Sequence, residues 1–420
     1  MDDDQLDNTD PPKSRSPWVS LRYRDYRLLF LVSLFATTAQ QMRLTQNLFQ
    51  VYELSGSALQ LGLTGLAQGV PLFALGLFGG TLADFVDRKK LLLMTTAGNL
   101  LVAVALGILT LTGAIQVWHI LIGIAFTSGL NIVLNPTRMA LISKLVPRSD
   151  LTNAVSLNSS VSQAAHFIGP MIAGVSLAWM DIGSSYLFNA LFYLPAASSI
   201  VLIRTSGAPD GRKETFSVGS FLGGLRFLFS EPVILAMVML DFIVVGIGYY
   251  RPLLPIFAKD ILAVGPAGFG VLSSAPAVGG MIGTVLLLLI GDVEHKGLLV
   301  LRSFLAYAFG VGFFALSGNF WLSAFLLGTL GLFNSLQAVM RQTTFHLLTP
   351  DPVRGRAFAV FNMFSQGANA VGATAVGFMA ALIGAPRSLL FGCAVGGVLT
   401  LSCWIGIPGL RNFGTEGRRL

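Results

Sequence analysis

The chain has 420 residues, of which 54% are hydrophobic and only 11% are charged, and its mean hydropathy is +0.72. This composition excludes an ordinary water-soluble protein and indicates an integral membrane protein. The formal net charge of +7 does not call for a nucleic-acid partner, because the positions of the basic residues follow membrane topology.

Runs of about twenty apolar residues, long enough to cross a ~30 Å hydrocarbon layer as a helix, recur along nearly the whole chain. We expect spans at 28–52, 58–82, 90–112, 117–141, 155–178, 184–204, 231–258, 266–290, 297–317, 320–346, 357–383 and 387–408. Lipid cannot hydrogen-bond to exposed backbone, and the alternating pattern of a membrane barrel is absent. The predicted fold is therefore all-helical.

The second half of the chain repeats the first. A shift of 203 positions matches Asn131 with Asn334, Arg138 with Arg341, Pro147 with Pro350, Ser162 with Ser365 and Gly174 with Gly377. A shift of 208 matches Arg43 with Arg251, Phe49 with Phe257 and Gly62 with Gly270. A repeat that keeps its orientation in the membrane needs an even number of crossings. We therefore expect twelve helices in two six-helix halves, related by a pseudo-two-fold axis.

These spans divide the chain into five parts: an N-terminal tail (1–27), a first bundle (28–204), a linker with a short interfacial helix (205–230), a second bundle (231–408) and a C-terminal tail (409–420). Most basic residues lie on the side of the two tails, so the positive-inside rule places both termini in the cytoplasm. The acidic start of the chain does not look like a cleavable signal. Cys393 and Cys403 lie on different faces of one span, which favours neither a disulfide nor a metal site.

Glycines of the second span, Gly62, Gly65, Gly69, Gly76 and Gly80, fall on one helical face. Such a face allows close packing against another backbone. Close packing is the favoured interpretation, and a sliding surface between the two halves is compatible with it.

The loop GGTLADFVDRKKL, residues 79–91, holds a glycine, an aspartate four residues later and a basic cluster. In this loop the sequence resembles the major facilitator superfamily, with Gly80, Asp84, Arg88 and Lys89 at the matching positions. The resemblance implies a cytoplasmic gate in which the aspartate faces a helix N-terminus, where a carboxylate is stabilised. Asp87 stands where glycine is usual in the family. The alternative is an ordinary basic cytoplasmic loop.

Three further segments, around 135–160, 221–232 and 342–362, resemble the branch of this superfamily that contains the enterobactin exporter and macrolide-efflux proteins. AHFIGPMIAG, residues 165–174, is similar to the Gly-Pro motif of its drug and proton antiporters, with Gly169, Pro170 and Gly174 matching. A Gly-Pro pair bends a helix and leaves a close-packing surface, so the motif predicts either a packing kink or a block against leak. Arg138 and Arg341, at matched positions, are predicted to act at an inner gate or interface.

Ionisable residues inside spans are costly, so each is a functional hypothesis. Asp241, near mid-membrane, is the predicted proton carrier; the alternative is a static ion pair with Arg43 or Arg251. Resemblance to the superfamily implies that the first, fourth, seventh and tenth spans line the central cavity. The substrate-binding candidates there are Gln40, Arg43, Gln46, Asn47, Asn131, Arg251, Asn334 and Gln337. His166 could titrate near neutrality, but a hydrogen-bonded packing role is the favoured interpretation.

The predicted function is secondary active transport, in the form of proton-coupled efflux of an amphiphilic, siderophore-like or drug-like small molecule by alternating access. Alternatives are uptake of a nutrient or movement of lysophospholipid. A membrane-embedded enzyme is disfavoured, because no catalytic or metal-binding motif is found and no cofactor is expected. We expect a monomer in the inner membrane of a bacterium, with the small molecule, protons and lipid as its partners.

Overall fold

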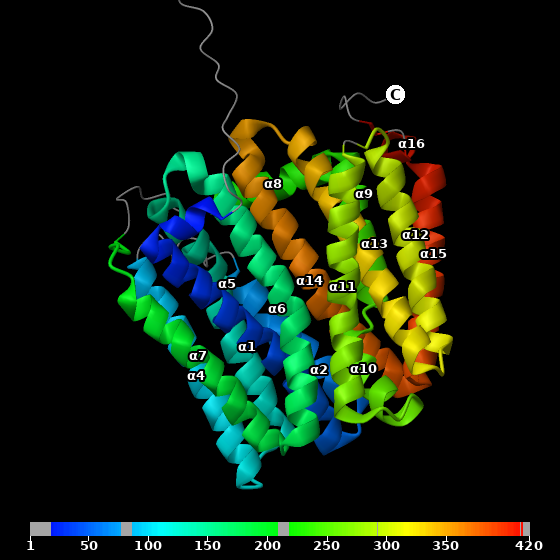
Figure 1. The fold of residues 1–420 in the computed structure, drawn as a ribbon. Coiled ribbons are helices and arrows are strands. Elements are labelled where there is room, and N and C mark those ends of the chain that lie inside the picture. Colours follow the sequence, from blue (N-terminus) through cyan, green and yellow to red (C-terminus); the bar gives the residue numbers. More distant parts are fainter. Residues whose placement is uncertain (1–17, 77–85, 209–217, 292, 412, 415–420) are drawn as a thin grey trace, which may run out of the picture.

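The fold is described from a computed structural model that covers residues 18–76, 86–208, 218–291, 293–411 and 413–414. Nearly all of these residues are helical (Figure 1). Before the linker the helices are η1 (Val19–Arg22), α1 (Arg24–Ser55), α2 (Ala58–Leu75), α4 (Arg88–Leu111), α5 (Val117–Leu145), η2 (Arg148–Asp150), α6 (Leu151–Trp179) and α7 (Ile182–Leu202). After it come α8 (Val218–Ser230), α9 (Pro232–Leu240), η3 (Asp241–Val245), η4 (Arg251–Leu253), α10 (Leu254–Ile256), η5 (Phe257–Ile261), α11 (Gly265–Ile290), α12 (Lys296–Leu316), α13 (Phe320–Leu348), α14 (Asp351–Ile383), α15 (Ala385–Gly406) and α16 (Pro408–Arg411).

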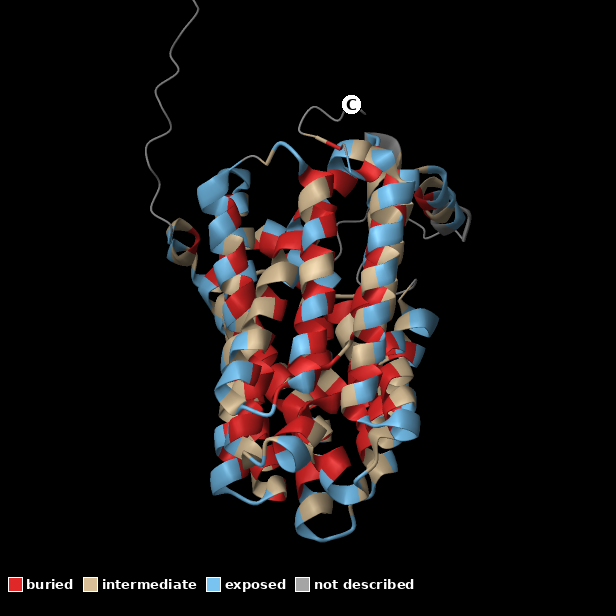
Figure 2. Ribbon diagram, turned by 90° about the vertical axis from the view of Figure 1, so that its right-hand side faces the viewer, coloured by how far each residue is buried: buried red, intermediate tan, exposed pale blue. Residues whose placement is uncertain are grey.

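Ten of the described helices are long and apolar enough to cross a membrane, and the bent pair of α8 with α9 and η3 raises the number to eleven. α1 is not among these ten. It has 32 residues and is long enough to cross a membrane, but its centre is rich in glutamine and is therefore less apolar than the other spans. With α1 included, the described helices account for the twelve predicted crossings. Trp179, Leu289 and Ile405 are 86%, 78% and 77% exposed, as expected for side chains that face lipid rather than water. Figure 2 shows exposed residues over the outside and buried residues in the interior.

We call α1 to α7 the N-half and α9 to α15 the C-half. In the N-half, α1 packs against α6 and α7, and α4 packs between α5 and α7. In the C-half, α13 packs against α11 and α12, and α12 packs against α15. The start of α1, the linker helix α8 and α16 lie at one end of the molecule, here called the linker end (Figure 1). The other end is called the distal end.

Short polar connections start several helices, as the sequence pattern requires. Asp181 accepts a hydrogen bond from Ser184 N at 2.8 Å, and Asn319 accepts one from Leu322 N at 3.1 Å. Such side chains satisfy amide groups that the first helical turn leaves free. The predicted interfacial helix is present as α8, which is bent by 98° from α9 and packs against α14.

The seventh crossing is not the continuous helix predicted for residues 231–258. From α9 the chain passes at Asp241 into the π-helical turn η3, and it leaves the helix at Tyr249 and Tyr250. Beyond this break, Pro252 and Pro255 lack amide hydrogens and cannot continue the hydrogen bonds of a preceding helix. Three short helical segments follow without a gap, namely η4, α10 and η5.

Glycines bring the two halves together near the distal end. A Cβ added to Gly62 of α2 would lie 2.9 Å from Gly377 Cα of α14, and one added to Gly174 of α6 would lie 2.6 Å from Gly270 Cα of α11. Real side chains do not approach so closely, so both positions require glycine in this arrangement. In the repeat, Gly62 is equivalent to Gly270 and Gly174 is equivalent to Gly377. The Gly62–Gly377 contact and the Gly174–Gly270 contact are therefore related by the internal pseudo-two-fold symmetry. Of the glycine face predicted on the second span, Gly62, Gly65 and Gly69 pack against α14 of the C-half, whereas Gly76 approaches only Leu72 of its own helix and Gly80 lies outside the described residues.

We predict that Gly174→Leu opens the distal end. The larger side chain would force α6 away from α11, and overpacking of this kind costs about 1–3 kcal/mol, enough to shift a two-state equilibrium severalfold. Spin labels at Ala114→Cys and Gly318→Cys, both at exposed positions of distal loops, would report the separation of the halves after replacement of Cys393 and Cys403 by alanine. The label distance is expected to lengthen.

The matched control is Gly397→Leu, because no neighbouring atom lies within 4 Å of a Cβ added there. This control should leave the label distance unchanged. An unchanged distance in Gly174→Leu as well would contradict the assignment of the Gly174–Gly270 contact to closure of the distal end.

Candidate functional site

A cavity of about 450 Å³ lies against the broken seventh crossing. Its volume falls in the range of pockets that bind small organic molecules. Most of its wall comes from the C-half, namely from η3, the break that follows it, and α11 to α14. The N-half contributes Gln163 and His166 of α6. The expectation that the first and fourth spans line the cavity is therefore wrong for this cavity, whereas the seventh and tenth spans do line it.

Asp241 and Arg341 form an ion pair on the cavity wall, with side chains that are 6% and 7% exposed. Ser365 Oγ donates a hydrogen bond to Asp241 Oδ2 at 2.8 Å and accepts one from Arg341 Nη2 at 2.9 Å. The group joins η3, α13 and α14. Because a single buried charge would be strongly destabilising, each charge here depends on the other. Neither Arg43 nor Arg251, the two partners considered for Asp241 in a static pair, pairs with it in this structure; Arg341 does.

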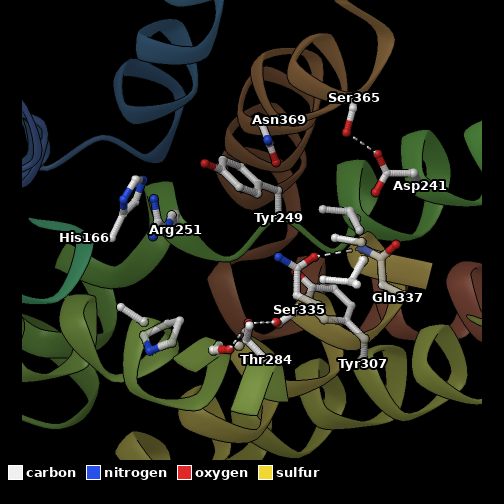
Figure 3. A pocket seen from close by; sticks show the side chains of 18 of the residues that line it. His166, Asp241, Tyr249, Arg251, Thr284, Tyr307, Ser335, Gln337, Ser365 and Asn369 are labelled. Carbon is white, nitrogen blue, oxygen red and sulfur yellow. Dashed lines mark hydrogen bonds between the residues drawn. The ribbon is translucent and has the colours of Figure 1, made fainter. Parts of the chain in front are cut away.

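Arg251 lies at the break, on the side of the cavity away from Asp241 (Figure 3). Its neighbours in the C-half are the phenol groups of Tyr249, Tyr250 and Tyr307. His166 of the N-half stands beside it (Figure 3). None of the carboxylates in the described residues forms an ion pair with Arg251. Arg251 therefore introduces an uncompensated positive charge at the junction of the two halves.

His166 is held in a defined tautomer by two hydrogen bonds. Its Nδ1 lies 2.6 Å from the carbonyl oxygen of Ser162, which can only accept, so Nδ1 carries the hydrogen. Its Nε2 lies 3.0 Å from the amide nitrogen of Gln41 and accepts from it. This pattern is that of a neutral imidazole, in agreement with the packing interpretation.

Arg43 does not line the cavity. It donates to the carbonyl oxygen of Asn99 at 2.9 Å and to the side-chain oxygen of the same residue at 2.5 Å. Its guanidinium carbon lies 5.7 Å from the centre of the Tyr193 ring. Arg43, predicted to bind substrate, thus ties α1 to α4 and α7 inside the N-half.

The other polar candidates of the first and fourth spans also lie away from the main cavity. Gln46 donates to Ser185 O and Oγ at 2.8 and 2.7 Å, and Asn47 accepts from Tyr186 at 2.8 Å, so both join α1 to α7. Asn47 also borders a small cavity of about 60 Å³ that reaches Arg251. Gln40 and Asn131 line another, much smaller pocket within the N-half.

The two amide residues predicted in the C-half do lie at the main cavity. Asn334 and Gln337 of α13 line the main cavity, and Gln337 Nε2 donates to Asn334 Oδ1 at 3.0 Å. Their placement on the wall agrees with the sequence. A role in substrate binding stays a prediction.

The matched arginines have different surroundings. Arg138 is 4% exposed and donates to Thr37 Oγ1 at 3.4 Å, a long hydrogen bond. Extended to the start of the first span, the shift of 208 pairs Ser33 with Asp241, and Ser33 donates to Asn158 Oδ1. Only the C-half arginine therefore has an acidic partner within the described residues. Their predicted role at a gate or interface stays a prediction.

Two residues of the predicted cytoplasmic gate motif, Gly80 and Asp84, lie outside the described residues. Of the others, Lys89 Nζ donates to the carbonyl oxygens of Val201 and Ile203 at 3.0 and 2.6 Å, at the end of α7. Arg88 Nη1 donates to Ala140 O at 3.5 Å. Asp87, unusual for the motif, caps the start of α4. These contacts stay inside the N-half, and a gate between the halves stays a prediction.

Both glycines of the Gly-Pro motif pack against neighbouring helices. A Cβ on Gly169 would lie 2.6 Å from Gln41 Cβ of α1, while Gly174 faces α11 of the C-half. Pro170 lies between them inside α6, which continues as one helix. The packing interpretation fits these contacts, and a role in preventing leak stays untested.

Polar contacts also join the halves at the distal end. Tyr52 of α1 donates a hydrogen bond to Asp260 of η5, and Lys259 Nζ lies 2.7 Å from Glu53 Oε2. Tyr52 and Asp260 are equivalent under the shift of 208, so they meet close to the pseudo-two-fold axis. Together with the glycine contacts, they hold the distal end closed in this structure. Among the described residues no group of three or more His, Cys, Asp or Glu could hold a metal ion.

The family model described as transmembrane secretion effector matches residues 15–408. The chain belongs to the transmembrane secretion effector family. This result agrees with the resemblance to the major facilitator superfamily seen in the sequence.

Curated relatives of this family member include the enterobactin exporter EntS of Shigella boydii serotype 18, which is 25% identical over 359 residues, covering 84% of this chain and 85% of the relative. The staphyloferrin A transporter of Staphylococcus aureus is 24% identical over 337 residues, covering 79% of this chain and 83% of the relative. Among solved structures, a POT family transporter in complex with 5-aminolevulinic acid has a TM-score of 0.76 at 10% identity, covering 92% and 96% of the two chains. That similarity shows the transporter fold.

The sequence did not single out Tyr249, Tyr250, Tyr307 or Ser365 as cavity residues. A signal for the first two existed, because two tyrosines and an arginine stand directly before a pair of prolines inside an apolar span. Ser365 is matched by Ser162 in the repeat, but only the fold brings it to Asp241. Tyr307 carries no sequence signal, since a single tyrosine in an apolar span is common.

We predict that Arg43→Gln lowers stability more than it affects ligand binding. The substitution removes charge-assisted hydrogen bonds to Asn99 and leaves its buried acceptors without their donor, which costs about 1.5–3 kcal/mol. The melting temperature in detergent should fall, while affinity for a transported compound should stay within a few-fold of the unmodified protein. Arg387→Gln, at an exposed position, is the matched control. If Arg43→Gln lost ligand binding but kept its melting temperature, the original prediction that Arg43 binds substrate would be correct.

Proposed function

We propose that this member of the transmembrane secretion effector family exports a siderophore-like, amphiphilic small molecule by alternating access, driven by protons. Two of its curated relatives are named for siderophores, enterobactin and staphyloferrin A. The match covers more than three quarters of each chain, so it includes both halves. Proton coupling rests on a different observation, the ion pair on the cavity wall.

The Asp241–Arg341 pair carries this proposal. Its two charges are buried from the outside of the molecule but border a cavity that can hold solvent and substrate. Asp241 also begins a π-helical turn, a local irregularity that is frequent at functional sites. Ionised, it holds η3 to α13 through Arg341 and to α14 through Ser365.

A proton on Asp241 would remove the charge that Arg341 needs. The pair would then lose most of its attraction, and Arg341 would be left to find solvent or another anion. Since α14 packs against α2 of the N-half, a change at Asp241 can reach the interface between the halves. Proton binding thereby favours one orientation of the halves, which is the requirement for coupling.

The contacts at the distal end support one order of events in the proposed cycle. With both tails in the cytoplasm, as the positive-inside rule predicts, the present state is closed to the outside of the cell. Substrate would enter the cavity from the cytoplasm, and the Tyr52–Asp260 and Lys259–Glu53 contacts would break when the distal end opens. We place the protein as a monomer in the inner membrane of a bacterium.

The decisive experiment compares the unmodified protein with Asp241→Asn in liposomes that contain a siderophore panel of catecholates and carboxylates. A pH gradient should accelerate transport by the unmodified protein. Asp241→Asn should lose this acceleration, at least about tenfold, because the amide cannot exchange a proton at physiological pH. Exchange of substrate down its own gradient needs no proton and should persist.

Asp181→Asn is the matched control. Hydrogen bonds from Ser184 hold the pKa of Asp181 below its usual range, so this carboxylate is charged at neutral pH, and it lies outside the cavity at the start of α7. Asparagine caps a helix equally well. Full pH-driven transport by Asp241→Asn would exclude Asp241 as the proton carrier. Transport of lysophospholipid or of nutrients in place of every siderophore would favour the alternative functions.

A further inference from the structure

The internal repeat shows how the surroundings of the two equivalent arginines differ. Arg43 and Arg251 are equivalent under the shift of 208, and extending the same shift to Asn99, the partner of Arg43, gives Tyr307. In the N-half the amide and carbonyl oxygens of Asn99 accept from the guanidinium. In the C-half Tyr307 offers a phenol in their place. Arg251 thus keeps hydrogen bonds to the neutral phenol groups of Tyr249 and Tyr250, but it lacks the amide and carbonyl oxygens that hold its counterpart.

The position of Arg251 adds to this difference. It lies where the seventh crossing is broken, and it borders both the main cavity and the small cavity beside Asn47. The opposite negative charge in the cavity, Asp241, is already matched by Arg341. His166 is neutral in its hydrogen-bonding pattern and adds no charge of its own. The end of the cavity at Arg251 therefore has a net positive charge.

We infer that Arg251 is the anchor for an anionic group of the substrate, a carboxylate or a catecholate, at a subsite flanked by Tyr249, Tyr250 and Tyr307. A guanidinium presents parallel N–H groups that match two adjacent anionic oxygens, as both ligand groups provide. The tyrosine rings supply an apolar surface with polar tips, which suits an aromatic or amphiphilic acid. The inference rests on the proposed transport function and names the chemical class that it accepts.

The subsite is completed by the N-half. Gln163 and His166 of α6 form the facing part of the wall, and α6 packs against α11 through Gly174. A ligand held by Arg251 therefore touches both halves in this state. When the halves rock, α6 moves relative to Arg251, and the affinity for the anion changes with the orientation. Because the ligand contacts α6 in one orientation of the halves and not equally in the other, its binding favours one orientation and is thereby coupled to the transport cycle.

Lipophilic cations are disfavoured by the same geometry. A cation at this end of the cavity would face Arg251, and Asp241 could receive it only by giving up Arg341. Neutral analogues would keep the contacts with the tyrosine rings but lose the ion pair. The expected order of affinity is therefore anion, then neutral analogue, then cation.

Binding to the full-length protein in nanodiscs, measured by isothermal titration calorimetry, tests this inference. The probes are citrate, 2,3-dihydroxybenzoate, its neutral ring analogue catechol, tetraphenylphosphonium and lysophosphatidylglycerol. Citrate or 2,3-dihydroxybenzoate should bind, and Arg251→Gln should weaken that binding roughly 10- to 100-fold, the range for loss of a charged hydrogen-bonding partner. Arg251→Lys should recover part of it, because it restores the charge without the fork geometry.

Arg387→Gln is the matched control and should leave every affinity unchanged, and all variants should keep the melting temperature of the unmodified protein. Equal affinities in Arg251→Gln, tighter binding of tetraphenylphosphonium, binding of lysophosphatidylglycerol alone, or no binding of either acid would each overturn the subsite. Transport separates the two proposals. Siderophore export that is driven by pH and unaffected by Arg251→Gln refutes the subsite alone. Anion binding through Arg251 without pH-driven export refutes the proposed function alone.

Discussion

The cost of placing charge inside a membrane-spanning bundle governs the arrangement of this protein. Away from water, a charged side chain is stable only with partners that replace its hydration. Asp241 has such partners in Arg341 and Ser365, and Arg43 has them in Asn99. Arg251 has neighbours but no anion among the described residues, and it lies on a cavity where solvent or a ligand can supply what the protein does not. The proposed anion subsite thus lies where the described residues supply no counter-ion for a buried charge.

Duplication makes this asymmetry visible. Equivalent residues begin with equal chemistry, and the two glycine contacts between the halves still exchange under the repeat. Around the charges the halves have diverged: Ser33 stands opposite Asp241, and Asn99 stands opposite Tyr307. The N-half uses its polar residues to bond α1 to α4 and α7. The C-half opens the corresponding crossing and places its polar residues on the cavity, so the C-half supplies most of the cavity wall.

Much of the fold follows from one-dimensional patterns. Apolar runs of membrane length predict helices because lipid leaves the backbone no other way to satisfy its hydrogen bonds. The repeat predicts two halves, and the glycine face of α2 predicts a close contact, which the structure places against α14. The loop motif and the Gly-Pro segment indicate the superfamily to which the matched family belongs. These features are local in sequence, so no knowledge of distant neighbours is needed.

The candidate site is different, because its chemistry depends on which helix faces which. The sequence by itself determined that Asp241, Arg43 and Arg251 are costly residues inside spans. Only the tertiary structure decided that Arg341 is the partner of Asp241, that Arg43 turns into the N-half, and that Arg251 borders the cavity. The physical reason is that hydropathy reports the depth of a side chain along a helix but not its rotation about the axis. Rotation is set by packing between helices, through contacts that are more than a hundred residues apart in the chain, such as Ser365 with Asp241.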